Sequence, residues 1–592
     1  MYDEALVFDI EADALLEGLT KIHCIAIGSI HQEPDLVPIP RALELLEVAP
    51  CIVGHNIQSY DIPAIQKIYP QWKPRGLIRD TLIMSRLQRV HQMMRHSLEA
   101  WGIKLKLHKG DFRGPWDEYT EEMGSYCIQD VRVNIAIWQD LLAESYPERA
   151  IQLEHDFSNI LDWQMAMGIK FDETPACTLA KELETELAET HAKLIETVPP
   201  KRETFVPKVN NKRYGYIKGV PIIKETPFNP GSRNQVKEFL IKKYNWAPVD
   251  FTDKGNPQLS GPVLSKLNYL EAPLFAKYFD AKKLCGQILT GDKSWLRSIK
   301  DGRIYGYVNH NGAVTGRCTH SGPNLAQVPR PSSYKGEACR SLFGAAPAPR
   351  RYKSRCDNDG EFTLVGCDAD GLELRNLAHY MAPYDEGRYS TIVESGDIHT
   401  ENQEAAGLAT RDNAKTFIYA HNYGAGDAKL GSIMDPDASF EQKKALGTKM
   451  RQKFMTRIPA LRILIQKVKT TAKKKGYLTG LDGRKLWVRS EHRALNTLLQ
   501  GAGSVIMKEA TVLQWKEVIG DELDWRSYMC SGYRAYPVLH VHDETQNCIE
   551  DEFVEEFKDI AERAVHQAGL NFNYKCPLSG TAKEGKTWAE TH

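Results

Sequence analysis

The chain has 592 residues and a formal net charge of −1, with 42% hydrophobic and 26% charged residues. This composition is ordinary for globular domains and excludes a chain that binds nucleic acid through an overall basic charge. No apolar run approaches the roughly 18 residues of a membrane-spanning helix, and the acidic start lacks the features of a signal peptide. The twelve cysteines form no CxxC pair, which predicts free thiols and neither a zinc site nor a disulfide framework. The length suggests about four domain-sized units.

Strands and helices alternate from the N-terminus to about residue 140, which predicts an α/β unit. Segments 5–8 and 22–27 are apolar and predict two buried strands joined by a turn. Asp9 and Glu11 close the first of these strands.

Three more polar residues extend this acidic pattern. Asp61 follows a later apolar segment, and Tyr126 and Asp130 share one face of a predicted helix because four residues separate them. In a hydrolytic site built on these acids, Tyr126 would orient the water that attacks the substrate. The acids offer oxygen ligands for two divalent ions: Asp9, Glu11, Asp61 and Asp130. The alternative is that these are ordinary acids at strand ends and on a helix surface.

A helix-rich region extends from about 150 to 300, with amphipathic helices predicted at 176–197 and 232–244. Between them lies the helix-poor segment 199–226, which holds seven Lys or Arg against two Glu. Two tyrosines stand among these cations, a pattern that suits a flap over duplex DNA phosphates. The alternative is a solvent-exposed connector.

An acidic strand follows an exposed loop predicted at 347–360. The strand covers 363–367 and ends at Asp368, and Glu373 lies five residues beyond that aspartate. Alone, Asp368 would be an ordinary turn former at a strand end.

A basic helix is predicted from Thr410, a plausible N-cap. Arg411, Lys415 and Tyr419 follow at intervals of four and therefore lie along one face, where two cations would suit a polyphosphate. Residues 443–475 contain 12 Lys or Arg and no acid, which predicts a DNA-contacting surface. The alternative is a solvated helical face.

His542, Asp543 and Glu544 form the most informative stretch, since they lie between two apolar segments. This pattern predicts a strand, a tight turn and a strand, with both carboxylates at the tip. Nucleotidyl transfer uses two divalent ions roughly 3.5–4 Å apart. Asp368 and Asp543 are the best candidates for their ligands, and Glu544 would support the pair.

The order acidic strand, basic helix, acidic hairpin resembles motifs A, B and C of the family A (DNA polymerase I-like) DNA polymerases. Motif B is matched by Arg411, Lys415, Tyr419 and Tyr423 at intervals of four, followed by Gly424. The N-terminal acids with their tyrosine are similar to the DEDDy class of 3′–5′ exonucleases. The resemblance covers almost the whole chain and is closest to the replicative polymerases of short-tailed bacteriophages.

This resemblance implies a role for each matching residue. Glu373 would exclude a ribose 2′-hydroxyl, which disfavours a related RNA polymerase. Asp370 stands where the family usually has Ser. The remaining nucleotide contacts would be Arg411, His399 and the catalytic Lys415 at the triphosphate, Tyr419 at the sugar and Tyr423 near the templating base. The DNA contacts would be Arg317, Asn324, Gln327, Asn496, Gln500 and His542.

The implied fold is mixed α/β and α+β. An RNase H-like exonuclease domain would occupy 1–145 and a right-hand polymerase domain 146–592. The polymerase would divide into a thumb at about 176–300 with a short loop at 199–226, a palm at about 301–384 and 480–592, and fingers at about 385–479.

The implied function is DNA-dependent DNA synthesis with 3′–5′ proofreading, using two Mg²⁺ per site or Mn²⁺ as a substitute. The implied partners are primer–template DNA, deoxynucleotides, a phage helicase–primase and a single-strand binding protein, in the cytoplasm of an infected bacterial host. Thioredoxin is not expected to be required, because 199–226 is much shorter than the thioredoxin-binding insertion of some relatives. The rival interpretations are an exonuclease whose second half only binds DNA, a clamp-like factor without catalysis, and an RNA polymerase.

Overall fold

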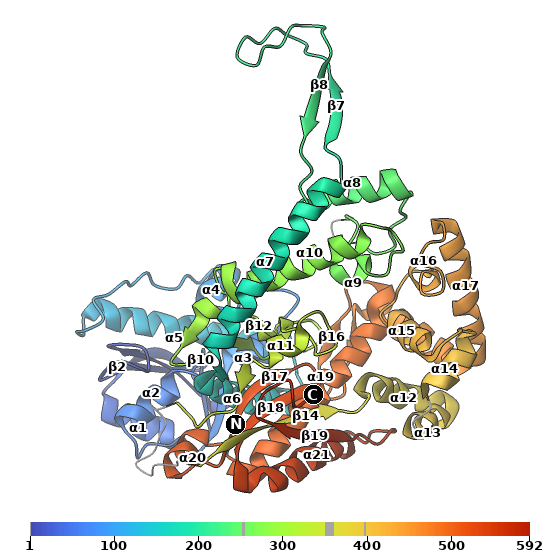
Figure 1. Ribbon diagram of the computed structural model, residues 1–592. Coiled ribbons are helices and arrows are strands. Elements are labelled where there is room, and N and C mark those ends of the chain that lie inside the picture. Colours follow the sequence, from blue (N-terminus) through green and yellow to red (C-terminus); the bar gives the residue numbers. More distant parts are fainter. Residues whose placement is uncertain (1, 252–254, 350–359, 396–397) are drawn as a thin grey trace.

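The computed structural model describes residues 2–251, 255–349, 360–395 and 398–592. Figure 1 shows an α/β unit at the left, a central sheet region, a helical region at the right and a hairpin that projects from the top. Most of the predicted loop at 347–360 lies outside the described residues. Within those residues, no helix is long and apolar enough to cross a membrane, and all eleven cysteines are free thiols.

A five-stranded sheet in the order β3-β2-β1-β4-β5 forms the N-terminal unit. β1 is antiparallel to β2 but parallel to β4. The strands are β1 (Leu6–Ala12), β2 (Ile22–Ser29), β3 (Gln32–Val37), β4 (Cys51–Gly54) and β5 (Leu77–Asp80). The helices are α1 (Ile39–Val48), α2 (Asp61–Ile68), α3 (Thr81–Gln88), α4 (Leu98–Leu105) and α5 (Glu121–Leu142). Both strands predicted in this unit are therefore present.

Both faces of this sheet are covered. Val7 packs in one apolar cluster with Trp101 and Trp138, whereas its neighbour Phe8 packs in a second cluster with Leu46. Successive side chains of a strand point to opposite faces, so an uninterrupted apolar run fills two cores.

Helix α6 (Glu148–Met167) leads from the N-terminal unit into the rest of the chain. A small sheet with the order β13-β6-β10-β9 follows it. Its strands are β6 (Ile169–Phe171), β9 (Ile299–Lys300), β10 (Arg303–Ile304) and β13 (Phe343–Gly344), and a separate pair is β11 (Tyr307–Asn309) with β12 (Thr319–Ser321). The short helix α11 (Gly336–Arg340) precedes β13.

The predicted amphipathic helices are α7 (Glu173–Thr197) and α8 (Arg233–Tyr244), which pack with α9 (Gly261–Leu264) and α10 (Ala272–Cys285) around a common apolar cluster. The side chain of Ser232 caps α8 by accepting a hydrogen bond from the Gln235 amide. Between α7 and α8, the helix-poor segment forms an antiparallel hairpin of β7 (Lys201–Phe205) and β8 (Ile222–Thr226). Figure 1 shows this hairpin extending away from the body.

The central sheet has the order β17-β18-β14-β19 and is entirely antiparallel. Its strands are β14 (Phe362–Ala369), β17 (Ala535–Val541), β18 (Glu544–Glu550) and β19 (Gly580–Gly585). Side chains of α19 (Ala494–Ile519), α20 (Trp525–Ser531) and α21 (Val554–Asn571) join the largest apolar core of the described residues with those of this sheet. β14, which carries Asp368, is thereby held between two partner strands.

The helical region has its own apolar core. Its elements are α12 (Leu372–Asp385), α13 (Arg388–Glu394), α14 (Ile398–Ala406), α15 (Arg411–Asn422), α16 (Asp427–Gly431), α17 (Phe440–Arg457), α18 (Pro459–Lys475), β15 (Tyr477–Thr479) and β16 (Lys485–Trp487).

Candidate active sites

The first candidate site lies at the open end of the central sheet. Asp368 pairs with Glu544 on β18 and with Thr581 on β19. The Ala369 amide donates a 3.1 Å hydrogen bond to the main-chain oxygen of Asp543, so the end of β14 is fastened to the turn between β17 and β18. Asp368 and Asp543 are thereby brought together, as predicted.

The pKa of Asp368 is raised to about 7 by partial burial and by the charges of Asp543, Glu544 and Asp370, with Arg340 opposing them. Several carboxylates in one place disfavour the charged form of each other, and divalent cations relieve that repulsion. The hard oxygen donors and this crowded negative charge fit Mg²⁺ or Mn²⁺ at Asp368 and Asp543.

Glu544 differs from its predicted place at the hairpin tip. It is the first residue of β18, and its side chain is buried at 6% exposure. Arg340 donates to both of its oxygens at 3.4 Å, Gln546 donates at 2.8 Å, and the Trp588 indole also donates. The alternation of side chains along a strand turns Glu544 inward while Asp543 remains at the tip. Glu544 therefore supports the site from beneath.

Asp370 is also held away from the open end. One carboxylate oxygen accepts a 2.8 Å hydrogen bond from Ser579, and the other accepts one of 2.8 Å from Thr581. Asp370, which stands where the family usually has Ser, is thus hydrogen-bonded by two hydroxyl groups beside β19. The charge of Asp370 still contributes to the raised pKa of Asp368.

Glu373 lies in the first turn of α12 and is near three other predicted residues. The charge of Glu373 and a hydrogen bond to it add to burial in raising the pKa of Tyr423 to about 12, while a hydrogen bond with Gln500 opposes them. Burial raises the pKa of Glu373, and the charge of Arg317 opposes that rise. Burial and the same Arg317 charge lower the pKa of His542. Glu373, Tyr423, Gln500, Arg317 and His542 therefore belong to one site.

The predicted basic helix is α15. Thr410 caps it by accepting a 3.1 Å hydrogen bond from the Asn413 amide. Arg411 and Lys415 are exposed on the face that leads to Tyr419. Burial and the charges of Glu373 and Asp543 raise the pKa of Tyr419, which places its hydroxyl near the acids. The side chain of His399 lies outside the described part of the chain.

Two of the predicted DNA-contacting amides carry a buried oxygen without a partner in the described part of the chain. The Oδ1 atoms of Asn324 and Asn496 are buried and have no hydrogen-bond partner among the described residues. Asn496 and Gln500 are one turn apart on α19, and Gln327 ends a 3₁₀ turn. Buried amides are normally paired, so unpaired ones suit a ligand surface.

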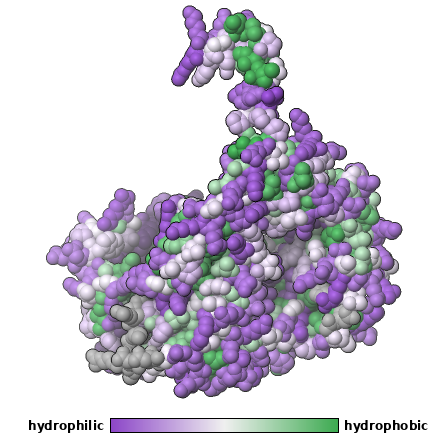
Figure 2. Space-filling view, in the orientation of Figure 1, coloured by the Kyte–Doolittle hydropathy of each residue, from purple (hydrophilic) through white to green (hydrophobic). Residues whose placement is uncertain are grey.

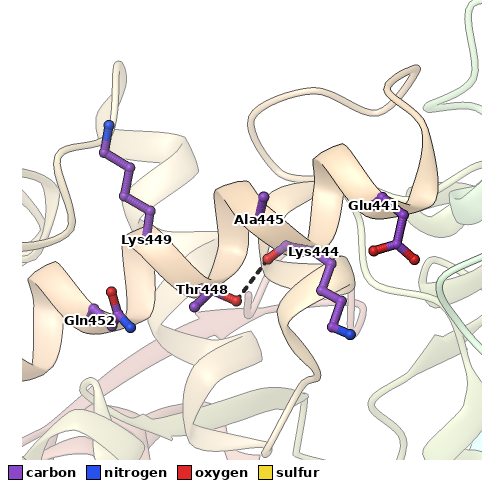
Figure 3. Close-up of a pocket in the computed structure, with 6 residues that line it drawn as sticks. All are labelled: Glu441, Lys444, Ala445, Thr448, Lys449 and Gln452. Atoms are coloured by element: carbon purple, nitrogen blue, oxygen red, sulfur yellow. Dashed lines mark hydrogen bonds between the residues drawn. The ribbon is translucent and has the colours of Figure 1, made fainter.

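The basic run 443–475 forms α17 and α18, and most of its cations are exposed, but two are not free on the surface. Lys443 is buried at 3% exposure, and Arg451 lies 2.7 Å from Asp427. Figure 3 shows Lys444 and Lys449 projecting in different directions from a shallow depression on α17. Successive residues of a helix point in different directions, so a run of charged residues in the sequence does not by itself form a charged patch on the surface.

The second candidate site lies in the N-terminal unit, against α5. Asp9 and Glu11 come from β1, Asp61 starts α2, and Tyr126 and Asp130 come from α5. The Ile10 amide donates a 3.3 Å hydrogen bond to Asp61, which ties α2 to β1. The structure thus assembles all five predicted residues from separate segments.

Burial is the main cause of the raised pKa values of the acids at this second site. It raises the pKa of Asp9 well above its usual value, with Asp61, Glu11 and Asp130 adding to the effect. Burial and the Asp130 charge raise the pKa of Glu11 to about 8, and burial raises that of Asp61 to about 7. The Oδ1 atom of Asp130 is buried without a hydrogen-bond partner among the described residues. Such a donor set fits divalent cations.

Sequence reasoning missed several residues that complete these sites. Lys109 lies 2.8 Å from Asp130, and its ammonium is 4.8 Å from the centroid of the Tyr126 ring. It comes from an irregular loop, which carries no pattern to detect. Cys127 is the sequence neighbour of Tyr126, but the direction of its side chain depends on how α5 packs. Arg340 and Trp588 lie far from Glu544 in sequence, and Arg340 stacks 4.3 Å from the Trp588 ring centroid.

Comparison with known proteins agrees with this arrangement. A profile described as DNA polymerase family A matches residues 216–590. The DNA-directed DNA polymerase of Escherichia phage T7 is 33% identical over 725 aligned positions, covering 99% of this chain and 100% of the relative. That of Enterobacteria phage T3 is 33% identical with the same coverage.

A solved structure shares the fold. It is described as the POL domain of Pol1 from M. smegmatis in complex with DNA primer-template and dNTP, and it aligns with a TM-score of 0.71 and 17% identity over 99% of this chain and 95% of that one. The profile match, the full-length phage relatives and the paired acids on β14 and the β17–β18 turn lead to one conclusion: this chain belongs to DNA polymerase family A.

Proposed function

We propose that the chain is a DNA-directed DNA polymerase that extends a primer by two-metal-ion nucleotidyl transfer and proofreads with a 3′–5′ exonuclease. The observation that carries the polymerase assignment is the 3.1 Å hydrogen bond between Ala369 and Asp543, which holds Asp368 and Asp543 at one open sheet end. Two Mg²⁺ held there would stabilise the attacking and leaving oxygens of an in-line displacement.

The residues around these acids divide the work of binding the nucleotide. Arg411 and Lys415 on α15 hold the triphosphate, since exposed cations one turn apart match successive phosphates. Tyr419 lies against the sugar. Glu373, with Tyr423 beside it, fills the space that a ribose 2′-hydroxyl would need.

The duplex is held by the amide and guanidinium groups of the same site. Asn496 and Gln500 on α19 face the minor groove, where purine N3 and pyrimidine O2 accept hydrogen bonds in every base pair. Arg317, Asn324, Gln327 and His542 position the primer and template strands. The orphaned amide oxygens of Asn324 and Asn496 support this assignment.

The exonuclease assignment is supported by the four buried acids and Tyr126. Asp9, Glu11, Asp61 and Asp130 would hold two divalent ions, and Tyr126 would orient the attacking water. A cavity of about 1150 Å³ opens beside Tyr126. The cations and imidazoles that line it would suit a single-stranded 3′ end: His55, Arg86, Arg95, His96, His108, Lys109 and Arg113.

The domain layout follows from these sites. Residues 1–145 form the exonuclease domain, whose mixed sheet and helices suit an RNase H-like fold. In the polymerase domain, 146–592, the central sheet is the palm, the helical region at about 385–479 is the fingers, and the helices between about 176 and 300 are the thumb. Helicase–primase and single-strand binding protein remain expected partners in an infected bacterium.

The β7–β8 hairpin would lie over the duplex as an extension of the thumb. Arg202 pairs with Glu225 at 2.6 Å and Lys201 with Glu238 at 3.0 Å. Lys224 lies opposite Glu203 on the paired strand, and its charge lowers the pKa of Glu203 after the larger effect of Lys201. The remaining cations of the hairpin form no ion pair among the described residues: Lys208, Lys212, Arg213 and Lys218. Figure 2 shows this hairpin with apolar and polar residues exposed together at its tip. Unpaired cations beside exposed tyrosines suit phosphates and sugars.

Primer extension on a DNA template with Mg²⁺ tests the proposal. The full chain should extend with deoxynucleotides, reject ribonucleotides and digest a single-stranded 3′ end. Glu373→Ala should admit ribonucleotides while the matched change Asp370→Ser should not, because Asp370 faces β19. Digestion without extension would instead favour an exonuclease whose second half only binds DNA.

A further inference from the structure

A cysteine thiol lies directly beside the N-terminal acids. The Sγ atom of Cys127 donates towards the main-chain oxygen of Asp9 at 3.4 Å and lies 3.9 Å from Asp9 Oδ2. Sγ and one carboxylate oxygen each from Asp9 and Glu11 lie within 4.8 Å of one another. One sulfur and two oxygen donors therefore face a common point.

The fold explains why these three atoms meet. Asp9 and Glu11 are two residues apart on β1, so their side chains leave the same face of the sheet. α5 packs against β1 and β2, and Cys127 is buried on it at 0% exposure. The thiol is held among the acids by the packing of a helix on a sheet and cannot turn to solvent.

The carboxylates of Asp9 and Glu11 accept few hydrogen bonds from the protein itself. Across the described residues, neither an N–H nor an O–H group donates to the carboxylates of Asp9 or Glu11, and the Oδ1 atom of Asp130 is buried and unpaired. Buried oxygens without donors are suited to a cation. Carboxylates alone select hard ions, whereas an added thiolate strongly favours zinc-class ions.

We propose that Asp9, Glu11 and Cys127 form a binding site for a thiophilic divalent cation such as Zn²⁺. In a tetrahedral site, zinc–sulfur and zinc–oxygen bonds of about 2.3 and 2.0–2.2 Å place the ligand atoms roughly 3.6 Å apart, so the group must close by about 1 Å around the ion. The S–H bond breaks as the Zn–S bond forms, and the proton leaves by way of Asp9 Oδ2, which lies 3.9 Å from Sγ, before release to solvent. The ion occupies the position that Mg²⁺ needs for digestion and so inhibits it.

Cd²⁺ is the probe for the binding part of this proposal, which does not depend on the proposed exonuclease. Cd²⁺ bound to thiolate absorbs in the near ultraviolet, and titration of the full chain should produce this band at one equivalent. Cys127→Ser should abolish the band. Cys530→Ser, which changes an exposed thiol, should retain it. Cys24→Ser should retain it too, although the Cys24 and Cys127 thiols share a hydrogen bond, because Cys24 supplies no ligand.

The carboxylates are tested in the same titration. Asp9→Asn with Glu11→Gln should weaken Cd²⁺ binding by about tenfold or more, because each removes an anionic ligand. A band that persists in Cys127→Ser and in Cys127→Ala, or one lost only in Cys24→Ser, would overturn the proposal. Primer extension by every variant confirms that the chain is folded.

Inhibition is the second readout, and it rests on the proposed exonuclease function. Zn²⁺ added to a digestion reaction with Mg²⁺ should inhibit the wild-type chain, and Cys127→Ser should need about tenfold more Zn²⁺. Equal inhibition of both proteins would overturn the proposed inhibition. A Cd²⁺ band in a chain that digests no DNA would instead disprove the exonuclease and leave the ion site intact.

Discussion

The two acidic sites of this chain balance their negative charge in different ways. In the N-terminal unit, four carboxylates lie against α5, and Lys109 is the cation closest to them, 2.8 Å from Asp130. At the central sheet, Asp368 and Asp543 remain at the open end of the strands, while the third acid, Glu544, is buried against Arg340 and Trp588. One group of acids is enclosed and has, among the described residues, a single ion-paired cation, Lys109, whereas the other is open and supported from beneath.

This difference indicates how each site would meet its substrate. An enclosed cluster admits a flexible single strand through the cavity beside Tyr126. The open end of the central strands would leave room for a duplex and an incoming nucleotide, with specificity expected from α12, α15 and α19. A substitution that inactivates one site should therefore leave the activity of the other site unchanged.

The largest expected effect is the loss of synthesis in Asp368→Asn or Asp543→Asn. Each substitution removes an anionic ligand at the open end of the central sheet. Extension should therefore fall by at least about 10²–10³-fold, the scale for removing one preorganised electrostatic group. Digestion of single-stranded DNA by the same protein should be unchanged. Near-normal extension by either variant would remove the polymerase assignment of these acids.

The converse change is Asp9→Asn with Glu11→Gln. Digestion should fall by a similar factor of about 10²–10³, because two ligands of the enclosed cluster are removed. Primer extension serves as the internal control and should remain. Parallel loss of both activities would show that the two sites are not independent.

Tyr419→Phe sharpens the comparison at the open site. Family resemblance implies that the Tyr hydroxyl partly fills the place of a nucleotide 3′-hydroxyl, so the wild type should accept dideoxynucleotides readily. The variant should discriminate against them by about 10- to 100-fold, the scale for one small group in a pocket. Single-nucleotide incorporation measures this, and unchanged terminator use would count against the position of Tyr419 at the sugar.

The hairpin should affect only the duplex-binding site. Replacing Lys208, Lys212, Lys218 and Lys224 by Ser should lower the slope of log affinity against log salt by about 0.9 for each DNA phosphate that is no longer neutralised. Product length on a long primed template should shorten, while single-strand digestion should not change. Adding thioredoxin should change product length little; a marked lengthening would show that the hairpin recruits it.

The smallest expected effect is on the pH dependence of stability. The folded pKa of Glu11 is about 8 and that of Asp61 about 7, both above unfolded values near 4. The folded protein therefore binds more protons than the unfolded one between about pH 4 and 8, and its stability falls as pH rises through this window.

Calorimetry of the metal-free protein measures this trend. The melting temperature of the N-terminal unit should fall from about pH 5 to 8, by roughly 2–4 °C for each kcal/mol of stability that is removed. Glu11→Gln with Asp61→Asn should flatten the dependence, and Mg²⁺ should reverse it by replacing the protons. A melting temperature that rises over this range would contradict the raised pKa values.

Much of the fold could be predicted because local patterns are strong here. The Thr410 cap, the helices predicted at 176–197 and 232–244, and the strands that carry Asp9 and Asp368 depend on neighbours in sequence. Glu544 was placed wrongly at the hairpin tip because a turn and the first residue of a strand differ by a single position. The alternation of side chains then decides which carboxylate faces outward.

The sequence by itself determined the candidates for the chemistry: paired acids at strand ends, a basic helix face and a tyrosine one turn from Asp130. Only the tertiary structure decided which long-range partners surround them, such as Arg340 and Trp588 at Glu544, the two hydroxyls at Asp370, and Cys127 and Lys109 among the N-terminal acids. Periodicity encodes the face on which a side chain lies. Which distant segment packs against that face depends on how whole helices and sheets fit together, and local spacing does not contain that information.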